Sequence, residues 1–200
     1  MLERITALAD ELAPFMTERR RDFHKHAETG WLEVRTSSII ASYLADEGYE
    51  LLLGDDLLDP DSRMGLPEPD VLVGHYERAL AQGADEKFAR RMKDGMTGVI
   101  GVLDNNTGPV IAMRFDIDAL GVVESTDEAH RPASEGFSSV NPGMMHACGH
   151  DCHAATGLAV AKMMSEFRSC WRGRLLLIFQ PAEEGVRGAR SIVNKGVLDE

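Results

Sequence analysis

The chain has 200 residues, of which 44% are hydrophobic, with 21 basic and 33 acidic side chains and a net charge of -12. This hydrophobic content supports one packed globular core and excludes a chain that is disordered throughout. The acidic balance argues against nucleic acid and anionic membrane as partners, because both carry the same sign of charge.

The N-terminus and the cysteines together predict a cytoplasmic protein. No apolar run reaches eighteen residues, and Glu3, Arg4 and Asp10 interrupt the turns where a signal peptide has its apolar core. The three cysteines are an odd number, and Cys148 and Cys152 lie in a histidine-rich stretch. This usage favours a metal or catalytic role in a reducing compartment over a disulfide framework.

The first half of the chain predicts helices around a short strand. Apolar residues three and four positions apart predict an amphipathic helix over 2–27, and a second helix begins near Thr36. A short strand follows at 51–53. The next stretch is rich in Asp, Pro and Gly and leads into a polar helix over roughly 70–93, so we interpret about 54–95 as a surface insertion.

The second half predicts alternating strands and helices. Strands are expected at 97–103 and 109–115, and the turn residues between them predict an antiparallel hairpin. A helix over 152–168, a buried strand over 173–179 and a helix over 186–194 follow. This alternation predicts an α/β fold with a mixed sheet.

Metal-ligating residue types gather in three segments that follow strands or enter a helix, where open α/β sheets place their ligand sites. Cys148 and His150 are two residues apart, so in an extended segment both side chains leave on one face and can reach the same ion. Six potential ligands lie within 146–153, three of them His. The pattern predicts a site for Zn²⁺ or Mn²⁺.

Two pairs of carboxylates accompany this segment. Glu183 and Glu184 are adjacent and, unless the backbone bends sharply, point apart, which suggests one metal ligand and one proton carrier beside bound water. Asp116 and Asp118 share a face at a strand end, where we expect Asp118 to orient a ligand imidazole. His24 ends the first helix, a position that the helix dipole alone favours for His.

Other functions fit part of this pattern. A thiol hydrolase would use Cys148 as nucleophile with His146 or His150 as base. A structural zinc module would use Cys148, His150, Cys152 and His153, although such modules have a second ligand pair about a dozen residues away. A non-catalytic metal-binding subunit or fragment is the third alternative.

The sequence also resembles the metal-dependent aminoacylase and carboxypeptidase family, in the branch of hippurate hydrolase and the plant auxin-conjugate hydrolases. The motifs that carry the resemblance are Arg20 to His24, Ser62 to Pro67, Met113 to Leu120, Gly143 to His153 and Leu176 to Gly188. Ser62 to Pro67 favours the subgroup that acts on p-aminobenzoyl-glutamate. The resemblance implies a three-layer, zinc-peptidase-like catalytic domain with a mixed, largely parallel sheet between helices.

The resemblance also implies roles for individual residues. Cys148, His150 and Glu184 would bind metal in a centre with two divalent ions, manganese first and zinc second, and Glu183 would be the general base with Asp118 behind the site. Asp116, His146, Asp151 and His153 are expected in support. The implied substrate is an N-acyl amino acid, p-aminobenzoyl-glutamate first and another such as hippurate second.

Family members are about twice as long as this chain. The resemblance therefore implies that residues 1–200 form the N-terminal part of the catalytic domain. The further His ligands, the lid used in dimer contacts and the rest of the catalytic domain would lie outside this sequence. A homodimer, or a heteromer with a related subunit, is the expected assembly.

Overall fold

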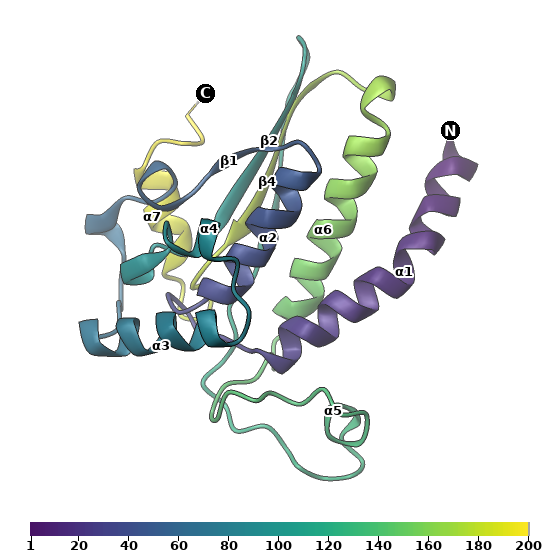
Figure 1. Ribbon diagram of the computed structural model, residues 1–200. Coiled ribbons are helices and arrows are strands. Elements are labelled where there is room, and N and C mark those ends of the chain that lie inside the picture. The colour runs from purple at the N-terminus through teal and green to yellow at the C-terminus, as the bar shows by residue number, and fades with distance from the viewer. Residues whose placement is uncertain (200) are drawn as a thin grey trace.

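The computed structural model describes residues 1–199. It contains a four-stranded sheet and seven α-helices within that range, shown in Figure 1. The elements are α1 (Leu2–Lys25), α2 (Val34–Asp46), β1 (Glu50–Leu52), α3 (Pro69–Ala81), α4 (Glu86–Ala89), β2 (Val99–Asn105), β3 (Val110–Asp116), α5 (Arg131–Ser134), α6 (His150–Glu166), β4 (Gly173–Gln180) and α7 (Gly188–Asn194).

The sheet is mixed, with strand order β1-β2-β4-β3. β2 runs antiparallel to both β1 and β4, whereas β3 runs parallel to β4 with Asp116 opposite Gln180. The expectation of a mixed sheet is therefore confirmed, but in the described part of the chain only the β3–β4 pairing is parallel. Because these two strands end side by side, the segments that follow them meet at one edge of the sheet.

The predicted hairpin between β2 and β3 is wrong. The turn itself forms, with the Asn106 amide donating to Asp104 Oδ1 at 3.1 Å, but β4 lies between the two strands. β4 is apolar on both faces, so it is buried best as a central strand of the sheet. β3 lies at the edge of the sheet, where Val110 to Arg114 are exposed.

Alternate residues of β4 face two separate cores, which accounts for the three layers. Leu175, Leu177 and Phe179 pack in the core that also contains residues of α1, α2 and α6. Leu176 and Ile178 pack on the opposite face with Trp31 and with Ile192 of α7. Figure 1 shows α1 and α6 on one side of the sheet and α7 on the other.

The segment 54–95 is more than the surface insertion that its composition suggested. Leu57 and Leu58 are fully buried in the core beside α7, and Phe88 and Met92 belong to the core beside α2. The Asp59 amide donates to the carbonyl of Ser191, so this segment is fastened to α7. Asp, Pro and Gly mark its turns correctly but do not report that leucines between them are buried.

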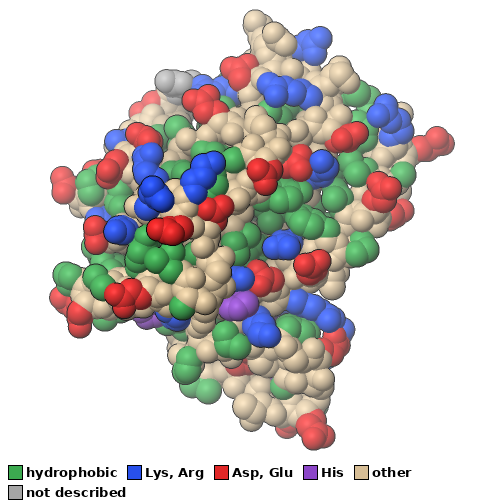
Figure 2. All heavy atoms as spheres, viewed as in Figure 1, with side chains coloured by type: hydrophobic (Ala, Val, Ile, Leu, Met, Phe, Trp, Pro, Cys, Tyr) green, Lys and Arg blue, Asp and Glu red, His purple; other side chains and the backbone are tan. Residues whose placement is uncertain are grey.

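The surface and the helices bear on possible partners. On the face drawn in Figure 2, basic side chains are interspersed among acidic ones, so the net charge of -12 does not form a uniform acidic surface there. Among residues 1–199, none of the helices combines the length and the apolar character needed to cross a membrane.

Candidate metal centre

Three of the predicted ligands converge between the start of α6 and the segment after β4. One ligand atom from each of Cys148, His150 and Glu184 lies within 4.8 Å of the others. The imidazole of His150 is buried, and its Nδ1 donates to the carbonyl of Asp118 at 2.9 Å. This bond leaves Nε2, which lies 3.8 Å from Glu184 Oε1, as the nitrogen that could bind an ion, the arrangement found for metal-bound histidine.

The atoms of this cluster fit a cation. Glu184 Oε1 is buried and has no hydrogen-bond partner in the structure, and it lies 3.8 Å from His150 Nε2. A buried carboxylate oxygen without a partner is costly in the absence of a positive charge. Thiolate, imidazole and carboxylate together are ligands for zinc or for another borderline divalent ion.

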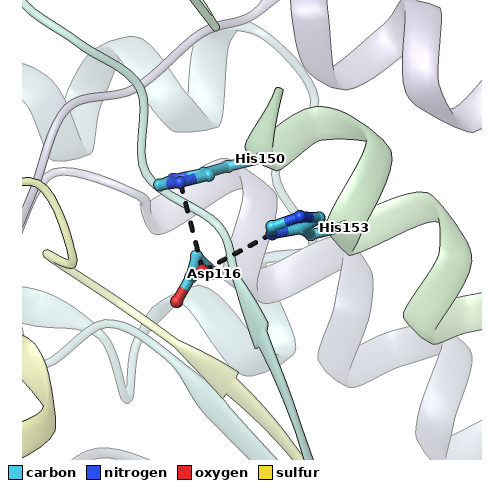
Figure 3. Close-up of side chains that lie close together, drawn as sticks. All are labelled: Asp116, His150 and His153. Carbon is cyan, nitrogen blue, oxygen red and sulfur yellow. Dashed lines mark ion pairs between the residues drawn. The ribbon is translucent and has the colours of Figure 1, made fainter. Parts of the chain in front are cut away.

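A second group shares His150. Asp116, His150 and His153 bring one atom each within 4.8 Å, as Figure 3 shows for their side chains. Asp116 Oδ2 lies 3.4 Å from His153 Nδ1 and 4.0 Å from His150 Nε2, and the two imidazole rings stack with centroids 5.4 Å apart. Asp116 and His153, both expected in support, thus lie beside the predicted ligands.

Asp118 holds the two glutamates in place. Its carboxylate is fully buried, and its two oxygens accept hydrogen bonds from the backbone amides of Glu183 and Glu184, each at 3.0 Å. Through its carbonyl it also orients His150. Asp118 therefore lies behind the two glutamates and His150.

The backbone bends sharply at the glutamates, so the expectation that they point apart does not hold. Ala182 and Val186 have positive φ angles of 49° and 58°. Glu183 Oε2 and Glu184 Oε1 each lie 3.8 Å from His150 Nε2. Left-handed backbone at residues other than glycine is uncommon and gathers at functional sites.

Glu33 supports the same loop and was missed from the sequence. It is fully buried, accepts the Ala182 amide at 2.7 Å with one carboxylate oxygen and accepts Thr97 Oγ1 at 2.7 Å with the other. Burial raises the pKa of Glu33, and the charge of Asp118 raises it further. The only sequence signal was an acid between the apolar Leu32 and Val34.

His146 and Asp151 do not join the ligand cluster. His146 is buried with neither ring nitrogen hydrogen-bonded, and burial lowers its pKa to about 4. Asp151 Oδ2 faces α1, where it lies 2.9 Å from His24 Nδ1 and 2.8 Å from Arg20 Nε. His24 is buried, and its Nε2 lies 2.9 Å from Glu124 Oε1, so it does more than respond to the helix dipole.

The thiol of Cys148 lies in negative surroundings. The neighbouring carboxylate of Glu184 is the main cause that raises its pKa, and slight burial and the charges of Glu183 and Asp116 raise it further. A nucleophilic cysteine needs the opposite, a lowered pKa beside positive charge. A bound cation would reverse this effect, so the electrostatics favour Cys148 as a ligand over Cys148 as a nucleophile.

Comparison with known proteins agrees with this site. The sequence profile described as "Peptidase family M20/M25/M40" matches residues 112–200, which include every residue of both ligand groups. A p-aminobenzoyl-glutamate hydrolase chain of Escherichia coli is 46% identical over 200 residues, covering 100% of this chain and 46% of that protein. Over residues 112–200, the chain is similar to the M20 peptidase family. The resemblance predicted from the motifs is thereby confirmed.

Other relatives give a similar result. Indole-3-acetyl-aspartic acid hydrolase of Enterobacter agglomerans is 50% identical over 95% of this chain and 44% of that protein. The crystal structure of an aminobenzoyl-glutamate utilization protein from Klebsiella pneumoniae matches with a TM-score of 0.81 and 42% identity, over 98% of this chain and 43% of that one. The chain spans about half the length of the curated relatives it matches.

A third solved structure bears on the metal. A protein of Bacillus subtilis described as a dinuclear metal binding peptidase of the M20 family matches with a TM-score of 0.66 and 32% identity, over 95% of this chain and 41% of that one. The expectation of metal ligands in this chain agrees with that description.

Proposed function

We propose that the protein containing this chain hydrolyses the amide bond of an N-acyl amino acid with two divalent metal ions. The convergence of Cys148, His150 and Glu184 on one point, with Glu183 beside them, carries the proposal. These three residues would be ligands, and bound ions would polarise the scissile carbonyl and lower the pKa of water. Manganese is proposed first from the family resemblance, and zinc second because of the Cys148 thiolate.

Glu183 is the proposed general base. Its carboxylate is about one-third exposed and lies 3.8 Å from His150 Nε2, so it can face both the ligand cluster and solvent. It would take a proton from the attacking water and deliver the same proton to the departing amine nitrogen. Asp118 fixes the backbone of Glu183 and Glu184, and Asp116 and His153 border the cluster.

The proposed substrate joins an aromatic acyl group to an acidic amino acid. The names of two relatives, at 50% and 46% identity, specify indole-3-acetyl-aspartate and p-aminobenzoyl-glutamate respectively. We place p-aminobenzoyl-glutamate first, because the match to that relative extends over all 200 residues. Products would be p-aminobenzoate and glutamate.

Residues 1–200 are proposed to be the N-terminal part of the catalytic domain, in a cytoplasmic enzyme. The edge strand β3 supports the proposal that this chain is part of a larger domain, since its residues Val110 and Ile111 are each 55% exposed and Met113 is 38% exposed. Apolar residues on an open strand edge are normally covered by further protein. A lid and further ligands would come from the rest of the protein. The proposed assembly is a homodimer or a heteromer, and the names of two relatives, which describe each as one subunit of a hydrolase, support the heteromer.

The test uses the full-length protein that contains this chain. It is stripped with a chelator, reloaded with Mn²⁺ or Zn²⁺, and assayed on p-aminobenzoyl-glutamate, indole-3-acetyl-aspartate and hippurate. We expect hydrolysis to stop on stripping, to return with metal, and to be fastest on an acidic amino acid conjugate. Activity that survives stripping but is lost on thiol alkylation would instead support the thiol hydrolase.

A further inference from the structure

Arg187 joins the loop that carries the two glutamates to a distant segment. Its Nε and Nη2 donate to the carbonyl of Glu184 at 3.2 and 3.0 Å. Its Nη1 donates to the carbonyl of Gly65 at 3.2 Å. One guanidinium therefore connects the backbone of a proposed metal ligand to Gly65, which lies 122 positions from Arg187 in sequence.

The guanidinium of Arg187 lies close to two glycines. A Cβ placed on Gly65 would lie 2.9 Å from Arg187 Nη1, and one placed on Gly30 would lie 3.0 Å from Nη2. Trp31, which is fully buried, donates Nε1 to the carbonyl of Met64 at 2.8 Å and so fixes the residue before Gly65. A side chain at position 65 or position 30 would therefore crowd the Arg187 guanidinium.

The loop from Ala182 to Gly188 needs such anchors. Ala182, Gly185 and Val186 all have positive φ, and for residues other than glycine this conformation is strained and persists only where surrounding contacts hold it. Glu33 and Asp118 hold amides of the loop. In the described residues, Arg187 is the side chain that holds the carbonyl of Glu184.

We infer that Arg187 is a positioning residue for the metal centre. It fixes the carbonyl of Glu184 and, through that peptide, the directions of the Glu183 and Glu184 carboxylates. The segment Ser62 to Pro67 is then the outer support of the site. The inference rests on the proposed function only for its kinetic consequences, since the contacts themselves do not depend on the substrate.

The first experiment substitutes Arg187 in the full-length, metal-loaded enzyme. We expect Arg187→Ala to lower kcat by about 10- to 100-fold, as small misplacements of catalytic groups do, with KM and bound metal nearly unchanged. Arg187→Lys and added guanidinium ion should each restore part of kcat. Arg190→Ala is the matched control, because Arg190 is exposed and contacts Met64 Sδ at 3.7 Å without a bond to the loop.

A second experiment tests the contact with Gly65. Gly65→Ala introduces a Cβ against Arg187, whereas Gly48→Ala at a similar positive φ meets nothing within 4 Å. We expect only Gly65→Ala to lower kcat, and to lower it much less when Arg187 is already Ala. Additive losses, or Arg187→Ala with the kcat of the wild type, would overturn the inference while leaving the proposed hydrolysis in place.

Hydrogen exchange separates the inference from the proposed function. Arg187→Ala should speed amide exchange in 182–188 and in 62–67 together, and Arg190→Ala should not. If the wild type hydrolysed none of the conjugates, the proposed function would fail. Amide hydrogen exchange would still test whether Arg187 holds the two segments. Unchanged exchange in Arg187→Ala would overturn the inference whatever the activity.

Discussion

Asp118→Asn removes one of the two bonds that hold the backbone of the catalytic glutamates. In the native chain each carboxylate oxygen of Asp118 accepts one amide, from Glu183 or from Glu184, at 3.0 Å. Asparagine has one oxygen and one NH₂ group, so in either orientation its NH₂ faces an amide donor. One buried amide then loses its acceptor.

The magnitude follows from burial and charge. Asp118 is fully buried, and a hydrogen bond to a charged group contributes about 1.5–3 kcal/mol, with a similar penalty for a donor left unsatisfied. We expect the free energy of unfolding to fall by roughly 2–4 kcal/mol. The Asp118 carboxylate also holds the backbone of the proposed ligand Glu184, and its Oδ1 lies 3.3 Å from His150 Nδ1. Metal affinity should therefore fall by about 10- to 100-fold.

The assay is chelator competition and urea unfolding of the full-length protein. Asp22→Asn is the control, because Asp22 pairs with Arg35 at 2.9 Å, away from the ligand cluster. The control should lose stability but keep metal affinity. Asp118→Asn with the metal affinity of the wild type would refute the claim that Asp118 supports the centre.

Three further substitutions test the site and the packing around it. Cys148→Ala should lower bound metal in elemental analysis, and Cys170→Ala should not; equal metal content in both would remove Cys148 from the ligand set. The pKa of Glu33 is 4.5 in the unfolded chain and higher in the folded one, so as pH rises the unfolded chain loses this proton first. The contribution of protonated Glu33 to the free energy of unfolding is therefore complete below pH 4.5 and declines as pH rises toward the folded pKa. Urea unfolding from pH 5 to 8 should show that the free energy of unfolding falls less steeply with pH in Glu33→Gln than in the wild type, by up to about 1.4 kcal/mol per pH unit. Identical slopes in the two proteins would contradict this. Gly157→Ala places a Cβ 2.5 Å from the Phe179 ring and should lower Tm, with an overpacking cost of about 1–3 kcal/mol. Gly74→Ala is the control: its Cβ meets nothing within 4 Å, so the free energy of unfolding should rise by up to about 1 kcal/mol. A rise in Tm for Gly157→Ala would contradict the overpacking argument.

The local patterns of the sequence predicted elements well and pairings poorly. The apolar run over 173–179 predicted a buried strand, and β4 occupies Gly173–Gln180. The turn after β2 also forms, but a turn signal carries no information about a strand that inserts between its two arms. The pairing of β3 with β4 depends on burial of both faces of β4, which is a property of the whole sheet.

The site divides in the same way. Cys148 and His150 are close as predicted, although the segment is not extended, since Gly149 has a φ of 82° and His150 begins α6. Glu184 joins them because it follows β4, at the edge of the sheet where the predicted segments meet. Glu33 and Arg187 act over 149 and 122 residues through bonds to backbone atoms, and no local pattern reports such contacts. The bend at Ala182 and Val186 was also hidden, since neither residue type favours positive φ.

The central claim is that Glu183 is the general base while Cys148, His150 and Glu184 bind metal. One pair of measurements on Glu183→Gln tests it most directly. Bound metal is determined by elemental analysis, and hydrolysis of p-aminobenzoyl-glutamate is measured on the same sample. The account predicts metal content equal to the wild type and turnover lower by about 10²- to 10⁴-fold, the contribution expected of a general base. Turnover near the wild-type rate with metal bound would contradict it.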